Sequence, residues 1–264
     1  MKKYLVIGNP ISHSLSPELH NYWFRQNNIN ASYDKKKLND NELENIILNI
    51  KKQIVSGINV TVPFKNTIIP YLDELSEEAK VTQAVNTIYL RNKKVIGHNT
   101  DIEGFENAIN KINFNFNNKK IFILGAGGVV PSIIYSSIKM GSSEILISNR
   151  TKEKAEKIKS IFENVKLINW GEIPNFDVII NATSMGLKHE DKLNLDLTKI
   201  GKNKLFYDVI YNPSETSFLT IGKKLGNKYE NGKLMFVYQA FSAFKLWHGI
   251  EPTINNETMK LLNR

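Results

Sequence analysis

The sequence contains no cysteine, no hydrophobic run of membrane-spanning length and no dense run of basic residues. The missing cysteines exclude disulfides, thiolate metal ligands and a cysteine nucleophile. No apolar segment approaches the roughly 20 residues that cross a bilayer, and the apolar stretch at the N-terminus is too short for a signal peptide. No spacing of histidine or acidic residues is typical of a metal site. We therefore expect a cytoplasmic protein without a membrane anchor or a bound metal.

The composition is that of an ordinary globular protein, with 41% hydrophobic and 23% charged residues among 264. This length favours two domains with separate cores over one domain. The formal net charge is +9, but the 35 lysines and arginines are scattered along the chain. Scattered positive charge favours small anionic ligands, such as a nucleotide cofactor or a carboxylate substrate, over nucleic acid.

Short apolar runs alternate with amphipathic segments along the whole chain, which is typical of an α/β fold. In the first hundred residues this alternation favours a largely parallel sheet. The apolar runs there are Leu5–Ile7, Ile46–Ile50 and Ile58–Val62, and a helical pattern begins at Pro17. After an Asn-rich connection over 113–119, the apolar segment Ile121–Leu124 indicates the first strand of a second domain.

The second half of the chain repeats the alternation in a form typical of a Rossmann domain. Predicted strands cover 121–124, 144–148, 165–168, 177–180 and 205–209, and a helix is predicted over 152–161. Two helical patterns and no strand follow in 232–264, so we expect these helices to pack back onto the first domain. The sequence thus predicts a substrate-binding and catalytic domain over 1–102, completed by 232–264. A Rossmann-like dinucleotide-binding domain is predicted over 103–231.

A glycine-rich segment, Gly125-Ala126-Gly127-Gly128, directly follows the first strand of the second domain. In a Rossmann unit such glycines let the backbone approach a pyrophosphate, and the next helix presents unpaired N–H groups to it. The sixth position of this fingerprint, usually Gly or Ala, is Val130, and Pro131 follows. The segment predicts a dinucleotide site, although the motif is imperfect.

The choice of nucleotide is indicated at Asn149, Arg150 and Thr151, which follow the second strand. NAD-specific proteins carry an acidic ribose ligand near this position, and none is present. Arg150, with Lys154 nearby, suits the 2′-phosphate of NADP, although the same residues could form a solvated helix start capped by Thr151. The loop Asn181–Gly186 either touches the cofactor or is a simple glycine-terminated turn.

Polar residues near a third strand suggest a catalytic site. Asn59 and Thr61 alternate with valines and share one face of the predicted strand, which Pro63 ends, and Lys65 follows. A lysine removed from water can exchange protons near neutral pH, although most lysines are merely solvated. Asp101 follows another strand and could either cap the next helix or pair with Lys65 as a proton relay.

Two serines, Ser14 and Ser16, lie between the first strand and a helix that begins with Pro17. Hydroxyls gathered there could donate to a carboxylate. Ser16 could instead be only an N-cap.

Taken together, these motifs resemble the shikimate dehydrogenase family in order and spacing over almost the whole chain. The matching segments are Gly8–Pro17, Asn59–Lys65, Ala84–Asn86, Asn99–Asp101, Gly125–Gly128, Asn149–Thr151, Asn181–Gly186, Tyr207–Pro213, Gly232–Gln239 and Trp247. The sequence departs from the family at Val130-Pro131 and at His98, a position that is often acidic in relatives.

The resemblance implies an NADPH-dependent reduction of 3-dehydroshikimate to shikimate, a step of aromatic amino-acid biosynthesis. It implies that Lys65 is the acid/base and that Asp101 supports it. The implied substrate residues are Ser14, Ser16, Asn59, Thr61, Lys65, Asn86, Asp101, Tyr211 and Gln239. The implied NADP residues are Gly125, Ala126, Gly127, Gly128, Val129, Asn149, Arg150, Thr151, Lys154, Thr183, Val209 and Gly232, with Glu77 near the nicotinamide.

Three other functions compete with this interpretation. An NAD-dependent quinate/shikimate dehydrogenase would share the substrate residues but should carry an acid near Asn149. A non-catalytic NADP-binding regulator would not need Lys65 and Asp101. An RNA-binding protein should carry a nucleic-acid motif, and we find none. We expect a small-molecule substrate, no nucleic-acid or membrane partner, and a monomer or homodimer.

Overall fold

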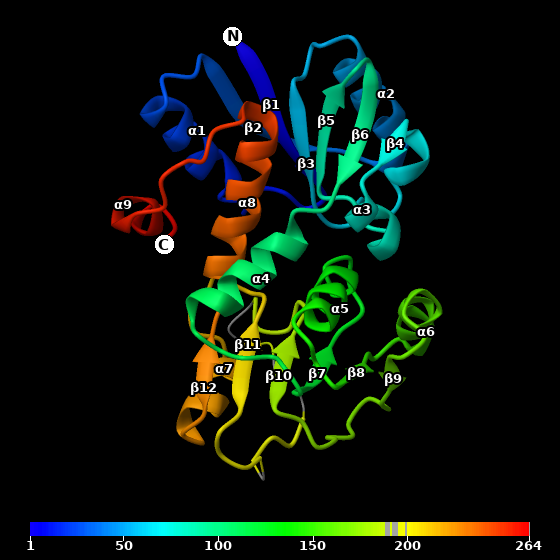
Figure 1. The fold of residues 1–264 in the computed structure, drawn as a ribbon, viewed down its shortest axis with the longest axis vertical. Helices are drawn as coiled ribbons and strands as arrows, with labels where there is room; N and C mark the ends of the chain where they lie inside the picture. Colours follow the sequence, from blue (N-terminus) through cyan, green and yellow to red (C-terminus); the bar gives the residue numbers. More distant parts are fainter. Residues whose placement is uncertain (188–190, 192–194, 199, 264) are drawn as a thin grey trace. The chain divides into compact units, whose positions relative to one another are not determined.

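The computed structural model describes residues 1–187, 191, 195–198 and 200–263, and the chain forms two compact units. Unit 1 contains residues 1–104 and 237–263, and unit 2 contains residues 105–236. The chain passes from one unit to the other within helices α4 (Asp101–Lys111) and α8 (Lys233–His248) (Figure 1). The predicted α/β fold, with C-terminal helices that return to the first unit, is confirmed.

Unit 1 is built on a mixed six-stranded sheet in the order β2-β1-β3-β5-β6-β4. Its strands are β1 (Lys2–Gly8), β2 (Ala31–Lys37), β3 (Gly57–Val60), β4 (Glu74–Leu75), β5 (Thr87–Arg91) and β6 (Lys94–His98). β1 pairs in parallel with β2 and β3, but β5 is antiparallel to β3 and to β6. β4 pairs in parallel with β6, so the predicted parallel pairing holds for three of the five strand pairs and fails for the two that β5 forms.

A two-residue turn makes β5 and β6 antiparallel to each other. Asn92 and Lys93 connect the paired residues Arg91 and Lys94, and both have positive φ, 52° and 64°. Such a turn matches the right-handed twist of two hairpin strands. The chain therefore reverses its direction between β5 and β6.

Unit 1 also contains α1 (Ser16–Gln26), α2 (Leu43–Lys51), α3 (Glu77–Thr82) and α9 (Asn256–Lys260), with short 3-10 turns at Asp40–Glu42 and Ile69–Tyr71. The apolar run Ile46–Ile50 lies on α2, which buries Ile46, Ile47 and Ile50 against Ile58 of β3 and Ile88 of β5. The helical spacing of these isoleucines places them on one face.

Helix α8 returns to unit 1 (Figure 1). Its Trp247 packs on the sheet of this unit. The indole Nε1 donates to the carbonyl of Ile88 on β5 at 3.2 Å. A Cβ at Gly57 of β3 would lie 2.6 Å from Trp247 Nε1, so only glycine leaves room there. The ring also packs on Tyr4 of β1 at 4.9 Å between centroids. The C-terminal helices thus complete the core around three strands of this sheet.

Unit 2 is a parallel six-stranded sheet in the order β12-β11-β10-β7-β8-β9. Its strands are β7 (Lys120–Leu124), β8 (Glu144–Ser148), β9 (Lys166–Leu167), β10 (Val178–Asn181), β11 (Leu205–Asp208) and β12 (Lys228–Glu230), and its helices are α5 (Val130–Lys139), α6 (Lys152–Ile161) and α7 (Ser217–Lys224). Counted from β7, this is the doubly wound order 3-2-1-4-5-6 of dinucleotide-binding domains. Ligands bind such sheets at the carboxyl ends of the two central strands, here β7 and β10.

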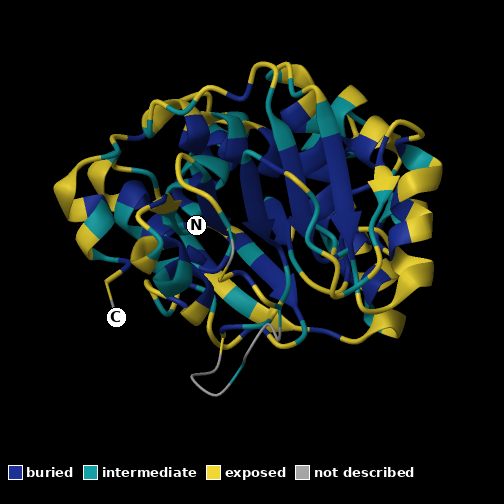
Figure 2. Cartoon of the chain, turned by 90° about the horizontal axis from the view of Figure 1, so that it is seen from below, coloured by how far each residue is buried: buried dark blue, intermediate teal, exposed yellow. Residues whose placement is uncertain are grey.

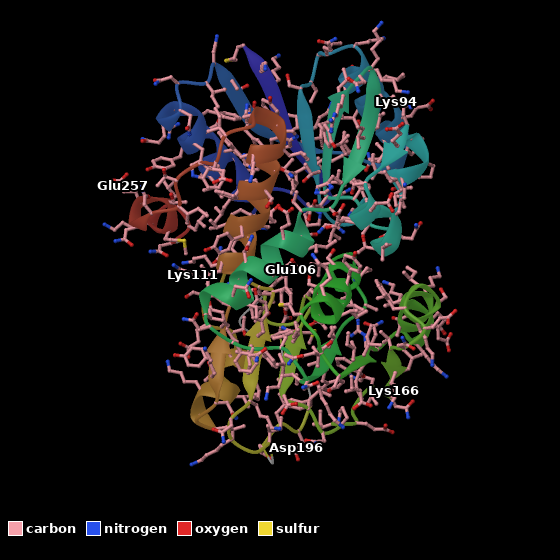
Figure 3. All side chains as sticks on the ribbon, in the orientation of Figure 1. Lys94, Glu106, Lys111, Lys166, Asp196 and Glu257 are labelled. Atoms are coloured by element: carbon pink, nitrogen blue, oxygen red, sulfur yellow. The ribbon has the colours of Figure 1, made fainter. Side chains whose placement is uncertain are left out.

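The surface carries most of the charge, while the strands are largely buried (Figure 2). Lys94 and Lys166, labelled in Figure 3, form ion pairs with Glu74 and Glu144 on neighbouring strands. Exposed pairs of this kind contribute little to stability. In the part of the chain that the structure describes, no helix has the length and apolar character needed to cross a membrane.

Candidate active site

Lys65 and Asp101 form a buried ion pair in unit 1. The Lys65 ammonium donates to Asp101 Oδ2, and the two residues are only 8% and 5% exposed. Strand β3 ends at Val60, two residues earlier than predicted, because the chain turns so that the Thr61 carbonyl accepts from the Phe64 N–H at 2.9 Å. This turn carries Lys65 inward, where its backbone carbonyl accepts from Val85 N–H at 2.8 Å.

Asp101 is the first residue of α4, and its side chain binds other side chains. Oδ1 accepts from Asn86 Nδ2 at 2.9 Å, and Oδ2 accepts from Lys65. The Asp101 N–H is itself satisfied by Asn99 Oδ1 at 3.1 Å. The sequence left two roles open for Asp101, a helix cap or a partner of Lys65, and the structure shows the pairing with Lys65. An acid fixed against an ammonium can orient it for proton transfer.

The pair is anchored in a network of buried amides and hydroxyls. Asn86 Oδ1 accepts from the Thr100 N–H at 2.7 Å and from Thr87 Oγ1 at 3.0 Å. Asn59 Nδ2 donates to Thr87 Oγ1 at 3.0 Å and to the carbonyl of Asn86 at 3.1 Å. Because backbone groups fix one side of each amide, both amide orientations are determined. The network therefore holds Asp101 in one position.

Ser14 and Ser16 lie together at the start of α1. Their hydroxyl oxygens are 3.2 Å apart, and the Ser16 N–H donates to Ser14 Oγ at 3.3 Å. The N-cap of α1 is Leu15 and no side chain caps this helix, so the alternative that Ser16 is only an N-cap was wrong.

The Thr61 methyl would lie 2.6 Å from a Cβ at Gly8, so this glycine lets the ends of β1 and β3 approach closely.

The glycine loop of unit 2 has the shape that a dinucleotide needs. Gly125 has φ +111°, and a Cβ there would lie 2.7 Å from the Ala182 carbonyl oxygen. Gly127 is exposed, with nothing nearer to its Cβ position than 3.9 Å. No side chain caps α5; its Val130 N–H donates to the Gly127 carbonyl at 3.0 Å, and Pro131 has no N–H. The loop therefore fits a pyrophosphate.

Val130 and Pro131, which differ from the residues usual in the family, do not disturb the glycine loop. Both residues are buried, and Pro131 occupies the first turn of α5. A proline is tolerated there because its missing N–H would have no helical partner. The first turn of the helix is thus preserved without the small residue that the family usually carries.

The predicted 2′-phosphate residues gather between β8 and α6. Asn149 Nδ2 donates to the Thr151 carbonyl at 2.6 Å, which folds the segment, and Arg150, Thr151 and Lys154 are all exposed. Thr151 occupies the N-cap position, but its side chain makes no cap hydrogen bond. The segment presents hydrogen-bond donors and positive charges to solvent at the carboxyl end of β8.

The loop Asn181–Gly186 packs directly on the glycine loop, since Ala182 lies against Gly125. Its conformation is set by Asp208, to which sequence reasoning gave no role. Asp208 accepts from Asn181 Nδ2 at 3.1 Å and from Thr216 Oγ1 at 2.6 Å. Burial raises the pKa of Asp208 to about 6, and these hydrogen bonds oppose the shift. Asn181 Oδ1 in turn accepts from Thr183 Oγ1 at 2.7 Å.

The structure brings two further predicted residues of unit 2 together. Gly232 lies against Val209, whose carbonyl oxygen would be 2.1 Å from a Cβ at position 232. Tyr211 stacks on Phe236 with ring centroids 4.6 Å apart. In unit 1, Gln239 is half-buried on α8, and Glu77 is exposed at the start of α3, paired with Lys80 at 2.6 Å. No contact joins Glu77 to Lys65 or Asp101 among the interactions of the described residues.

The fold and these two groups of residues define a class of protein, the nucleotide-dependent oxidoreductases with a Rossmann unit and a separate unit that carries the acid/base pair. Two family models match the chain. "Shikimate dehydrogenase substrate binding domain" covers residues 6–88, and "Shikimate / quinate 5-dehydrogenase" covers residues 106–209. The chain belongs to the shikimate dehydrogenase family.

Individual relatives agree over the full length. The "Shikimate dehydrogenase (NADP(+))" of Pelagibacter ubique is 56% identical, with 99% of each chain covered. The crystal structure of shikimate dehydrogenase from Aquifex aeolicus has a TM-score of 0.91 at 38% identity, covering 99% of this chain and 97% of that one. A Thermus thermophilus shikimate 5-dehydrogenase in complex with NADP(H) and shikimate has a TM-score of 0.89 at 27% identity, with 99% and 98% covered.

Proposed function

We propose that this chain catalyses the reversible, NADPH-dependent reduction of 3-dehydroshikimate to shikimate, a step of aromatic amino-acid biosynthesis. The observation that carries the proposal is the buried Lys65–Asp101 pair, held by Asn86 in a chain of this family. The protein acts in the cytoplasm on a small-molecule substrate, as a monomer or homodimer, without nucleic-acid or membrane partners.

Lys65 is the proton donor in this mechanism. NADPH, when bound, supplies the hydride that reduces the ketone carbon. The Lys65 ammonium has three N–H groups, of which one binds Asp101, so another can point to the ketone oxygen. As negative charge develops on that oxygen, Lys65 donates a proton to it, and Asp101 stabilises and orients the ammonium. In the reverse direction Lys65 accepts the proton of the hydroxyl.

Polar residues of unit 1 orient the substrate around this pair. Ser14 and Ser16 donate to the carboxylate, because their hydroxyls lie side by side at the start of a helix. The ring hydroxyls bind Asn59, Thr61, Asn86 and Asp101. Gln239 of unit 1 and Tyr211 of unit 2 are further substrate residues, assigned from the family resemblance.

Unit 2 binds the cofactor, NADP. The backbone of Gly125, Ala126, Gly127, Gly128 and Val129 takes the pyrophosphate at the start of α5. Asn149, Arg150, Thr151 and Lys154 take the 2′-phosphate, and Thr183, Val209 and Gly232 line the nicotinamide end. Glu77 of unit 1 is assigned near the nicotinamide from the resemblance alone.

Replacing Arg150 with alanine tests the choice of NADP. The exposed guanidinium can bind a phosphate in a bidentate way, so we expect the NADPH KM to rise about tenfold to hundredfold. NADH has no 2′-phosphate, and its KM should stay nearly constant. The measurement is the initial rate with each cofactor.

A matched control is Lys159→Ala, which removes an exposed positive charge from the last turn of the same helix α6. It should leave both KM values unchanged. Equal losses for NADPH and NADH in Arg150→Ala would show that this residue does not read the 2′-phosphate, and would favour the NAD-dependent quinate/shikimate dehydrogenase.

A further inference from the structure

A buried tyrosine supports the amide network of the proposed substrate site. Tyr33, on β2, has no solvent exposure, and its hydroxyl donates to Asn59 Oδ1 at 2.6 Å. This phenol therefore binds a residue of the network that reaches Asp101.

The direction of each hydrogen bond along this path is fixed by chemistry. Asn59 uses both amide hydrogens on the Asn86 carbonyl and on Thr87 Oγ1, so its Oδ1 is the atom that faces Tyr33. The Tyr33 proton is thus committed to Asn59. Burial raises the pKa of Tyr33, so the phenol keeps this proton.

The path continues in the same direction to the catalytic pair. Thr87 Oγ1 donates to Asn86 Oδ1 at 3.0 Å, and Asn86 Nδ2 donates to Asp101 Oδ1 at 2.9 Å. Donors that all point one way polarise one another, so each bond strengthens the next. The path runs without a break from Tyr33, through Asn59, to the carboxylate that holds Lys65.

The ring of Tyr33 is held rigidly in place. His20, also without solvent exposure, stacks on it with centroids 4.4 Å apart and the rings 1° from parallel. Burial lowers the pKa of His20 to about 3, with a smaller contribution from the charge of His248, so this imidazole is neutral. A flat, uncharged neighbour fixes the plane of the phenol and brings no charge beside it. The direction in which the Tyr33 hydroxyl points is therefore set by packing.

We propose that Tyr33 is a positioning residue of the substrate site, which holds the side-chain amide of Asn59 in place for a substrate hydroxyl. This inference rests on the proposed placement of the substrate at these residues. With both amide hydrogens of Asn59 used, only a lone pair of Oδ1 is left for a ligand. Asn59 then accepts from a substrate hydroxyl and cannot donate to a ketone. Tyr33 thereby helps to select a hydroxyl at this position.

Tyr33→Phe removes the hydroxyl and keeps the stacked ring. We expect kcat/KM for shikimate to fall about tenfold, mainly through KM, with the KM for NADP unchanged. The matched control is Tyr4→Phe, which removes a hydroxyl from a tyrosine that is 2% exposed and packs on Phe24 and Trp247. It should leave all constants unchanged. The thermal unfolding temperature of both variants shows whether either substitution lowers the stability of the fold.

Two outcomes overturn the inference. One is a shikimate KM in Tyr33→Phe equal to that of Tyr4→Phe. The other is a loss confined to kcat with both KM values unchanged, since this is what a smaller fraction of folded enzyme would give. Asn59→Ala separates this result from failure of the proposed function. An unchanged shikimate KM in Asn59→Ala would remove the assignment of Asn59 to the substrate, and the inference with it.

A double variant tests whether Tyr33 acts through Asn59. If it does, Tyr33→Phe should cost less in the Asn59→Ala background than in the parent chain, because the side chain that Tyr33 holds is already gone. The expected loss of the double variant is therefore smaller than the product of the two single losses. A loss equal to that product would show that the two residues act independently and would overturn the inference.

Discussion

Lys65→Ala should lower kcat by about 10²-fold or more, because the reaction loses its proton donor. Asp101 and the Asn86 amide that fixes it remain in place, so the loss measures the ammonium rather than the whole network. NADP binding should be unchanged, since the glycine loop belongs to the other unit. Single-turnover rates with shikimate and NADP, and a fluorescence titration with NADPH, provide the two measurements.

The control must separate chemistry from stability, because removing one partner of a buried ion pair leaves the other charge unpaired. Lys51→Ala breaks a half-exposed pair with Asp73, at 2.8 Å, in the same unit and should leave kcat unchanged. Lys65→Met fills most of the vacated volume and should be as inactive as Lys65→Ala, even if it unfolds at a higher temperature. Undiminished turnover in folded Lys65→Ala would contradict the assigned role.

Gly125→Ala should both destabilise unit 2 and abolish most cofactor binding. The residue has φ +111°, which costs an alanine about 1–3 kcal/mol, and its Cβ would lie 2.7 Å from the Ala182 carbonyl oxygen. Because the obstacle is backbone, the loop 181–186 must move, and we expect a total loss of about 3 kcal/mol or more. Chemical unfolding without cofactor gives the loss, and NADPH titration gives the change in affinity.

Gly127→Ala provides a matched contrast within the same loop. Its Cβ would come no nearer than 3.9 Å to another atom, and its φ is not positive, so stability should change by less than about 1 kcal/mol. NADP affinity should still fall, because the methyl group occupies the space where a pyrophosphate approaches the backbone. Equal stabilities of Gly125→Ala and Gly127→Ala would contradict this account of the loop.

The elements with strong apolar periodicity could be predicted from the sequence. The predicted bounds of β8 and α6 agree with the structure, because their patterns are regular and turns flank them. Strands β2 and β12 were missed, since their residues are mostly polar edge positions without an alternating pattern. The bounds of β5, which begins at Thr87, were also not predicted, because pairing with β3 and β6 decides them.

The site was predictable where one residue carries the chemistry in a recognisable motif. Lys65 and Asp101 could be named because each follows a strand at a characteristic position, and the structure places them together. Tyr33 and Asp208 could not be named as supporting residues. Tyr33 and Asn59 are 26 residues apart in sequence and lie on the two strands that flank β1, and Asp208 meets Asn181 of the paired strand across 27 residues. Such contacts depend on the register of neighbouring strands, which no local pattern encodes.

The most direct test of the central claim is the reduction of NADP by shikimate, followed by absorbance, with NAD and quinate run in parallel on the same preparation. We expect a fast reaction with NADP and shikimate, and much slower reactions when either is replaced. Preference for NAD or quinate would instead select the quinate/shikimate dehydrogenase. Absence of any reaction, with NADPH still bound, would contradict the catalytic role of the Lys65–Asp101 pair and favour a non-catalytic NADP-binding regulator.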